Sequence, residues 1–427
     1  MTLVVFLGSL LLAMAIGIPI SFALLVSGVA LMWHMDIFEA QILAQNLLGG
    51  ADNYPLLAVP FFLLAGEIMN EGGLSRRIVE FAMALVGHIR GGLGYVAIVA
   101  SILLSALSGS AVADAAALTA MLLPMMVAAG HAPHRAAGLI AASGVIAPVL
   151  PPSIGLVIFG VTANVSISKL FMAGIAPGLM IGLALWITWA IVARHEGAVP
   201  PPRKPLGDLL LALRRCGWAL MLPVIILVGL RMGVFTPTEA GVVAAVYALF
   251  VSSVVYRSLK LPQLWGIFKA AAKTTAVVMF LVAAAMVSAW LITVADLPSK
   301  VVGMLQPFLT SPITLMVLIM VLVMIVGTAM DMTPTILILT PVLMPVVKAA
   351  GIDPVYFGVM FIMNNAIGLI TPPVGVVLNV VAGVGRMSMD TVTRGVLPFM
   401  IAQFLVMFLM VLFPWLVTWP ARLFYGG

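Results

Sequence analysis

Long apolar runs with few charges decide what this chain can fold into. The clear candidates for spans are Leu3–Met32, which we expect to be one spanning helix, and Leu56–Asn70, Leu170–Ala193, Gly217–Met232, Ala240–Tyr256, Thr274–Ala295 and Val392–Val417. A helix needs about 20 apolar residues to cross the hydrocarbon core of a bilayer. Hydrophobic residues make up 63% of the chain and charged residues only 8%, which is too little charge to cover a soluble protein of this length. The sequence therefore predicts an all-α polytopic membrane protein with roughly ten membrane segments.

Two further apolar regions are interrupted near the middle by polar turn residues. They are residues 93–128, interrupted at Leu107–Ser110, and residues 312–350, interrupted at Val326–Thr328. Each half has roughly 15–18 residues, which is short for crossing about 30 Å of hydrocarbon at 1.5 Å per residue. We therefore expect two re-entrant hairpins. In the second hairpin we expect the helix to restart with Thr333 as its cap and Pro334 as its first helical residue.

Each hairpin is followed by a helix that adjacent prolines must break. Residues 135–163 contain Pro148, Pro151, Pro152 and Ser153, and residues 355–385 contain Thr371–Gly375, which includes a second Pro–Pro pair. Two consecutive prolines remove two backbone donors and clash with the preceding turn. Open backbone at membrane depth is tolerated only where it lines a cavity or is buried in protein. We therefore expect two discontinuous helices.

The two regions form an internal repeat with a constant offset of 221 residues. The matched pairs are Pro124 with Pro345, Gly130 with Gly351, Pro133 with Pro354, Pro151 with Pro372, Pro152 with Pro373, Gly174 with Gly395 and Pro177 with Pro398. Seven matches at one ungapped offset argue for a true repeat and against chance. We divide the chain into residues 1–92 (scaffold helices and an interfacial arm), 93–195 (first transport repeat), 196–311 (cytoplasmic loop, scaffold helices and arms) and 312–427 (second transport repeat).

Basic residues set the orientation of these segments. Cytoplasmic loops carry an excess of Lys and Arg, and such residues flank the first hairpin at Arg90 and Arg135 and fill the connection Arg194–Arg215, which includes Arg203 and Lys204. Five crossings then separate the hairpins. Because five is odd, the second hairpin opens outward and the repeats are inverted. Inverted repeats with broken helices are typical of secondary transporters with a binding site near the midplane.

Three shorter stretches are amphipathic and too polar to cross the membrane. They are Leu74–His88, Leu261–Lys273 and Leu297–Leu309. Each alternates charged and apolar residues in a way typical of helices that lie along the interface. We therefore expect three interfacial helices outside the spanning set.

The breaks could bind cations, since unwound carbonyls and half-helix C-termini suit a hard monovalent cation such as Na⁺. The first candidate Na⁺ site comprises Ser108, Gly109, Ser110, Ser143, Gly144, Pro148 and Pro151. The second comprises Gly327, Thr328, Gly368, Thr371 and Val374. For the Gly and Ser residues, close helix packing by small side chains is the alternative interpretation.

Polar residues near the breaks are the candidates for substrate contacts. They are Ser153, Asp114, Asp331, Asn364, Asn365 and Asn379. An ionisable residue inside the membrane is by default functional. The alternative for Asp114 and Asp331 is that each neutralises a helix N-terminus, and the asparagines either bind substrate hydroxyls or join neighbouring helices.

Other motifs exclude several classes of protein. Thr236–Glu239 contains an acid but is typical of a capping box. The sequence lacks the G-x-x-x-x-G-K-[ST] motif of ATP hydrolysis, and it offers no Cys/His metal cluster and no plausible nucleophile–base set. The net charge of +6 gathers in loops and is not a nucleic-acid signature. We therefore expect neither an enzyme nor a nucleic-acid-binding protein.

The order of five motifs along the whole chain resembles the large permease of TRAP (tripartite ATP-independent periplasmic) transporters. These motifs are AVPFFLLAGE (58–67), LSGSA (107–111), PPS (151–153), FTPTEA (235–240) and TPPVG (371–375). The resemblance implies an elevator mechanism like that of the ion transporter superfamily, in which a hairpin-bearing domain moves against a rigid scaffold. It also implies Na⁺ as coupling ion and a location in the bacterial inner membrane.

The same resemblance implies two protein partners and a class of substrate. The partners are a small four-helix membrane subunit (Q type), expected here as a separate chain, and a periplasmic substrate-binding protein (P type). The substrate is a small organic acid: a sugar acid of the diketogulonate kind, a sialic acid or a dicarboxylate. Two alternatives stay open, namely a proton-coupled anion transporter and an ion channel or scaffold of a membrane complex.

Overall fold

Every regular element is a helix in the part of the chain that the computed structural model describes, residues 2–195, 205–309 and 311–425. Those of the first half are α1 (Thr2–Ala15), α2 (Ile20–His34), α3 (Ala40–Ala51), η1 (Tyr54–Leu57), α4 (Ala58–Glu71), α5 (Leu74–Val86), α6 (Gly92–Ser108), α7 (Ala111–Ala128), α8 (Pro133–Gly144), α9 (Ile154–Ala163), α10 (Ile167–Val192) and η2 (Ala193–His195). Those of the second half are α11 (Leu206–Arg231), α12 (Pro237–Phe250), η3 (Val251–Val255), α13 (Leu261–Val294), α14 (Leu297–Leu305), η4 (Gln306–Phe308), α15 (Pro312–Ala329), α16 (Met332–Ala349), α17 (Pro354–Gly368), α18 (Val376–Gly385), α19 (Met389–Leu412) and α20 (Trp415–Tyr425).

Length and composition mark many of these helices as membrane-spanning. In the described ranges, eight helices are long and apolar enough to cross a membrane, and the number rises to nine if α3 and η1–α4, bent by 52°, form one span. The fold class is therefore confirmed as an all-helical polytopic membrane protein. Of the basic connection, Arg203 and Lys204 lie outside the described residues.

Two helix–turn–helix hairpins and two broken helices are present where the repeat predicts them. That the hairpins re-enter the membrane stays a prediction, because α7, α15 and α16 are among the helices long enough to span it. The hairpins are α6–α7 and α15–α16, and the broken helices are α8–α9 and α17–α18. Each break contains a cis Pro–Pro peptide bond. The 221-residue offset also relates the two halves before the hairpins, because it carries α3–α4 onto α13, and α2 onto α12–η3. The repeat therefore covers nearly the whole chain.

The repeats interlock in what we call the hairpin body, helices α6–α10 and α15–α19. The second helix of each hairpin packs on the far half of the other repeat's broken helix, so α7 contacts α18 and α16 contacts α9. The long last helix of each repeat packs on the near half of the other repeat's broken helix, so α10 contacts α17 and α19 contacts α8. Phe159 of α9 lies 6.1 Å and 5.8 Å, between ring centroids, from Phe357 and Phe361 of α17. Neither repeat therefore completes its own core.

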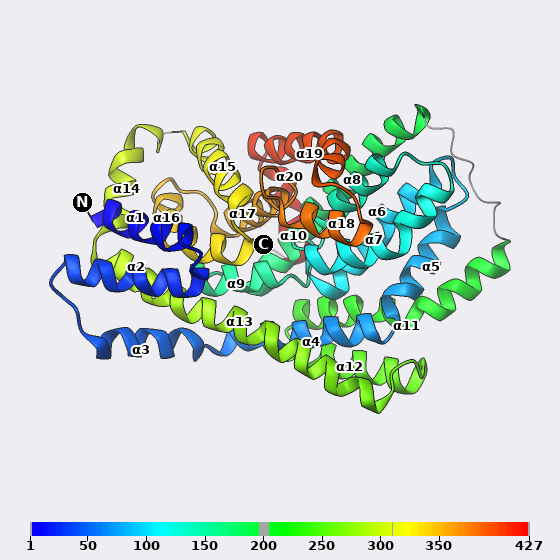
Figure 1. Cartoon of the computed structure of the whole chain (residues 1–427), viewed down its shortest axis with the longest axis horizontal. Coiled ribbons are helices and arrows are strands. Elements are labelled where there is room, and N and C mark those ends of the chain that lie inside the picture. The colour runs from blue at the N-terminus through cyan, green and yellow to red at the C-terminus, as the bar shows by residue number, and fades with distance from the viewer. Residues whose placement is uncertain (1, 196–204, 310, 426–427) are drawn as a thin grey trace.

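The remaining long helices form what we call the frame, α1–α4 and α11–α13. Helix α13 crosses obliquely beneath the hairpin body (Figure 1) and packs on α2, α3 and α4, while α4 packs on α12. Two helices join frame to body: α5 contacts α11 and α6, and α14 contacts α13 and α16. The predicted division at residues 92, 195 and 311 stays an interpretation.

The expectation of one spanning helix over Leu3–Met32 is wrong. The structure has two helices, α1 and α2, packed on each other. The chain turns at Gly17, whose φ of +89° a residue with a side chain rarely adopts. Pro19 then precedes α2 and cannot donate a backbone hydrogen bond. The apolar composition hid this turn.

A separate interfacial helix over Leu261–Lys273 is also wrong, because these residues begin the continuous 34-residue helix α13. At 1.5 Å per residue this helix is about 51 Å long, well beyond the hydrocarbon thickness. Lys269 and Lys273 are exposed, whereas Ile267 and Ala271 of the same turns are buried. The charged end of α13 can thus project past the apolar layer without a break in the helix.

Candidate functional site

The tip of the first hairpin is a turn of three small residues. Ser108 ends α6, Gly109 takes φ +60°, and Ser110 caps α7 by accepting a hydrogen bond from the Ala113 N–H at 3.3 Å. Glycine adopts the left-handed conformation without steric cost, and serine is a preferred N-cap. The Ser108 hydroxyl donates to Oδ1 of Asp114 at 2.5 Å. The Asp114 carboxylate of α7 is therefore held against the turn.

This tip touches the break of the first discontinuous helix. A Cβ atom on Gly109 would lie 2.5 Å from the Pro152 carbonyl oxygen, and one on Gly144 would lie 3.0 Å from Cβ of Ala115. Neither position has room for a side chain unless its neighbours shift. The candidate residues of the first cation site are therefore brought together by the contact of α6–α7 with the end of α8.

Ser153 stabilises the break itself. Its fully buried hydroxyl caps α9, accepting from the Leu156 N–H at 3.2 Å, and donates to the Pro148 carbonyl oxygen at 2.5 Å. Because Pro151 and Pro152 lack N–H groups, this side chain replaces part of the lost backbone bonding. A role of Ser153 in substrate binding stays a prediction.

The second site forms where the end of α15 meets the end of α17. A Cβ atom on Gly368 would lie 2.9–3.0 Å from backbone atoms of Gly327, so the two helices approach through their glycines. Oδ1 of Asn365 lies 3.4 Å from the position of a Cβ on Gly327. These three candidate residues are therefore neighbours.

The hydroxyl and carbonyl groups of the second site are held by local hydrogen bonds. Thr328 and Thr371 donate, each at 2.8 Å, to carbonyl oxygens three and four residues earlier. Asn379 donates to the Val374 carbonyl oxygen at 2.8 Å. A hydroxyl that has used its hydrogen keeps its two acceptor lone pairs. The oxygens of Thr328 and Thr371 can therefore still accept a cation or a donor.

Asp331 caps α16, and the expected cap at Thr333 is wrong. The Asp331 side chain accepts from the Met332 N–H at 2.8 Å, and the helix begins at Met332. The helix starts two residues earlier because the acidic side chain can reach the free N–H group. Asp114 and Asp331 both lie at helix N-termini, as the helix-dipole interpretation requires, and their part in binding stays a prediction.

Unpaired buried oxygens lie near both breaks, where four of the ten unpaired buried side-chain polar atoms of the described residues are found. Within the described residues, Oγ of Ser143, Oδ2 of Asp114, and Oδ1 of Asn364 and of Asn365 have no hydrogen-bond partner. Asn364 uses only its amide hydrogen, on the Met320 carbonyl oxygen at 2.5 Å. Buried polar groups are paired in the great majority of cases. Hard oxygens left free in this way are the ligand type that an alkali cation takes, so the residues present fit Na⁺.

The orphan oxygens of Ser143 and Asn364 occupy equivalent positions in the two repeats, since they differ by the same 221 residues. Both residues are fully buried and lie in the last turn or next-to-last turn before a break. The two breaks therefore share the placement of an oxygen acceptor and differ in its chemistry, a hydroxyl in one and an amide in the other.

Gln403 was not among the predicted site residues. It is fully buried in α19, donates to the Ala142 carbonyl oxygen at 2.8 Å, and has an unpaired Oε1. A glutamine inside an apolar spanning helix is a usable signal. Its contact with Ala142, the residue before Ser143, joins positions 261 residues apart, and the sequence gives no sign of it.

The chain matches one family, described as "Tripartite ATP-independent periplasmic transporter, DctM component", over residues 7–416. It is 55% identical to the 2,3-diketo-L-gulonate TRAP transporter large permease protein YiaN of Escherichia coli, covering 99% of both chains. It is 41% identical to the sialic acid TRAP transporter large permease protein SiaM of Vibrio cholerae, covering 96% of both chains. These relatives are named as transport permeases, not enzymes.

Two further matches extend the comparison. The C4-dicarboxylate TRAP transporter large permease protein DctM of Vibrio cholerae is 35% identical, over 97% of this chain and 96% of that one. Among solved structures, the YdaH transporter of Alcanivorax borkumensis matches with a TM-score of 0.64 at 17% identity, covering 89% of this chain and 88% of that one. At this identity the structural match supports the fold alone.

Proposed function

The chain belongs to the family of DctM components of tripartite ATP-independent periplasmic transporters, and from that premise we propose that it imports a small organic acid by Na⁺-coupled transport. It is a multi-pass protein of the bacterial inner membrane. The observation that carries the coupling proposal is the pair of equivalent breaks, each with buried oxygens that lack a partner. The full function therefore rests on the family for transport and on the breaks for coupling.

The proposed substrate is a carboxylate, with a sugar acid first. The relative named for 2,3-diketo-L-gulonate is 55% identical, against 41% for that named for sialic acid and 35% for that named for C4-dicarboxylates. A carboxylate can be held at helix N-termini, where free N–H groups and the positive dipole end favour an anion. The N-termini of α7 and α9 lie at the first hairpin tip and break, beside the candidate cation ligands.

Sodium is the proposed coupling ion because the ligands are mostly uncharged oxygens. The first site would hold it with Ser108, Ser143 and backbone carbonyls near Gly144. The second would hold it with Thr328, Thr371, the unpaired amide oxygen of Asn365 and carbonyls near Gly368. The bound cation would supply the positive charge that an incoming carboxylate needs in a site of low polarity. A proton relay would need a chain of ionisable side chains across the membrane, and the predicted site residues include only Asp114 and Asp331.

An elevator movement is the proposed conformational change. The interlocked repeats make the hairpin body one unit, since each repeat is completed by the other. The frame touches this body through few surfaces, chiefly α4 with α6 and α9, and α13 with α16. Two short helices, α5 and α14, join body and frame. This arrangement supports movement of the body, with both cation sites, as a rigid unit relative to the frame.

We propose that a small membrane subunit and a periplasmic binding protein complete the transporter. The family description itself calls the system tripartite. The frame exposes large apolar side chains such as Leu261, Trp265 and Val277, at 82%, 77% and 63%, which a lipid layer or a partner helix would cover. Uptake by this chain alone, without either partner, would contradict this part of the proposal.

The test is substrate uptake into proteoliposomes that hold all three components. We expect 2,3-diketo-L-gulonate or another sugar acid to accumulate when a Na⁺ gradient points inward, and to stop when Na⁺ is replaced by K⁺. Uptake that follows an imposed pH gradient and ignores Na⁺ would overturn sodium coupling. Dissipation of ion gradients without substrate accumulation would favour a channel.

A further inference from the structure

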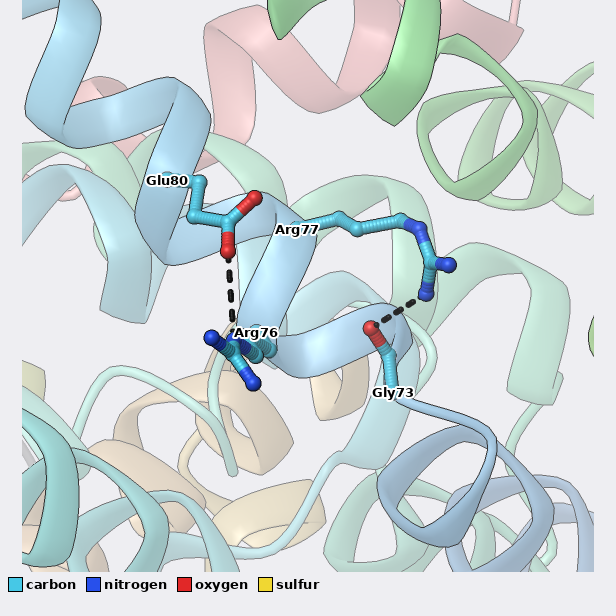
Figure 2. A network of polar contacts seen from close by, with 4 residues as sticks. All are labelled: Gly73, Arg76, Arg77 and Glu80. Atoms are coloured by element: carbon cyan, nitrogen blue, oxygen red, sulfur yellow. Dashed lines mark hydrogen bonds and ion pairs between the residues drawn. The ribbon is translucent and has the colours of Figure 1, made fainter. Parts of the chain in front are cut away.

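A basic cavity of about 510 Å³ lies at the junction of α5, α11 and the segment after η3. Arg76, Arg77, Glu80, Arg215 and Tyr256 line it, and Figure 2 shows three of them on α5. A second cavity of about 230 Å³ continues from the same Arg77, Glu80 and Arg215. A volume of this size is typical of sites that hold a small molecule or headgroup. The predicted cation and substrate sites include none of these residues.

Contacts fix the position of Arg77 without neutralising it. Its Nη1 donates to the Gly73 carbonyl oxygen at 3.0 Å, and its guanidinium carbon lies 3.8 Å from the ring centroid of Tyr256. The Tyr256 hydroxyl in turn donates to the Arg215 carbonyl oxygen at 2.6 Å. A guanidinium stacked on an aromatic ring is held in place and keeps its other N–H groups. Arg77 and Arg215 are thus brought to one cavity by Tyr256.

The charges in the cavity favour an anion. Arg76 pairs with Glu80 at 3.2 Å, but both side chains are exposed, at 80% and 52%, so this pair is weak. In the part of the chain that the structure describes, no carboxylate pairs with Arg77 or Arg215. The larger cavity sets three guanidinium groups against the Glu80 carboxylate, and the smaller one adds the carboxylate of Asp208. The combined lining therefore keeps an excess of one positive charge, and the larger cavity an excess of two. A phosphodiester accepts such N–H groups in bidentate fashion.

The cavity opens beside an apolar helix face. Three large apolar side chains of α11 are about half exposed: Leu211 at 45%, Trp218 at 47% and Met221 at 48%. Arg215 lies four residues after Leu211 and three before Trp218, so it shares their face of the helix. Arginine-rich connections mark the cytoplasmic side, and Arg90 of the α5–α6 connection donates to the Arg194 carbonyl oxygen. The cavity therefore joins a cationic pocket to a lipid-facing surface at the cytoplasmic boundary.

We propose that this cavity binds the phosphodiester headgroup of an anionic phospholipid from the cytoplasmic leaflet, with its acyl chains along α11. Basic pockets between helices on the cytoplasmic side are suited to such headgroups. A bound phosphodiester bridges Arg77 of α5 and Arg215 of α11. Because α5 follows the turn at Gly72 and Gly73 and packs on the hairpin helix α6, the lipid ties this connecting helix to the frame.

Native mass spectrometry of the purified full chain tests the proposal, with dioleoylphosphatidylglycerol as the anionic lipid and dioleoylphosphatidylcholine as the neutral one. We expect the anionic lipid to bind about tenfold more tightly, and Arg215→Gln to lower its affinity about tenfold, the scale of one charge-assisted hydrogen bond. Arg214→Gln is the matched control, because Arg214 is the adjacent charge and lines neither cavity. It should leave the affinity unchanged.

Two further arms keep the result decisive. Glu80→Gln removes the one carboxylate of the larger cavity and should raise the affinity for the anionic lipid, which a damaged fold would not do. Glycerol 3-phosphate carries a phosphate group at least as negatively charged as the lipid's phosphodiester but has no acyl chains, and it should not compete at the concentrations that saturate the lipid. Equal losses in Arg214→Gln and Arg215→Gln, or full competition by glycerol 3-phosphate, would overturn the proposal. So would purified complexes in which a partner subunit occupies the cavity.

Discussion

The contact between Gly327 and Gly368 predicts unequal effects of one added methyl group. A Cβ on Gly368 would lie 2.9–3.0 Å from the backbone of Gly327, whereas a Cβ on Gly327 would lie 3.4 Å from Oδ1 of Asn365 and 3.5 Å from Cα of Gly368. The distances from a Cβ on Gly327 are ordinary van der Waals contacts. Those from a Cβ on Gly368 are too short for carbon atoms that are not bonded. Gly368→Ala therefore forces α15 and α17 apart by roughly 0.5 Å, and Gly327→Ala does not.

We expect Gly368→Ala to lower the free energy of unfolding by about 1–3 kcal/mol, the usual range for overpacking in a close-packed interior. Gly327→Ala is the matched control, because the same methyl group is added to the other side of the same contact. There we expect a change near zero or a gain of up to about 1 kcal/mol, since alanine is the better helix former. The difference between the two variants isolates the collision.

The assay is thermal unfolding of the purified protein in detergent, with and without Na⁺. Gly368→Ala should lower the midpoint and raise, several-fold, the Na⁺ concentration that gives half of the full stabilisation, since the proposed second site spans this contact. Gly327→Ala should not lower the midpoint. Equal destabilisation by the two variants, or a larger effect of Gly327→Ala, would refute the reasoning from helix proximity.

Three other outcomes follow from the structure. Asp331→Ala removes the observed cap of α16 and should lower the free energy of unfolding by about 1 kcal/mol, measured by thermal unfolding. Thr333→Val should change it little. A larger loss for Thr333→Val than for Asp331→Ala would show that Thr333 is the cap after all. Ser143→Ala deletes an unpaired oxygen and should weaken the Na⁺ dependence of uptake in proteoliposomes while leaving the unfolding midpoint in Na⁺-free buffer unchanged; an unaltered Na⁺ dependence would remove it from the site. Single cysteines at Ala128 and Ala350, in a background without the native cysteine, should react with an impermeant reagent from opposite faces, and labelling from one face would contradict the inverted topology.

The broken helices and hairpins could be predicted because their causes are local. Adjacent prolines cannot continue a helix wherever they occur, and the turn at Ser108–Ser110 carries its own glycine and cap. The capping box at Thr236 was predicted for the same reason and is confirmed, with Glu239 accepting from the Thr236 N–H at 2.8 Å. Features that four or five neighbouring residues determine can be predicted from the sequence.

Features that depend on contacts between distant parts of the chain could not be predicted from the sequence. The repeat was detected only where prolines and glycines mark it, although the same offset relates α3–α4 to α13. The α3–α4 segment is a bent pair of helices and α13 is one continuous helix. The two segments therefore correspond in position within the repeats although their sequences have diverged. Likewise, the glycine at position 17 was a local signal for the α1–α2 turn that the surrounding apolar residues outweighed. The pairing of Gln403 with Ala142 had no local signal at all.

The interlocking of the repeats has a consequence for how this protein is made. Helix α18, on which α7 packs, begins 248 residues after α7 ends (376 minus 128). At synthesis rates of about 5–20 residues per second, that interval lasts roughly 12–50 s. During it the first hairpin can pack on α8 but lacks α18, its partner from the second repeat. Completion of the hairpin body thus waits for nearly the last helices to insert, so biogenesis ends with the packing between the two repeats instead of beginning there.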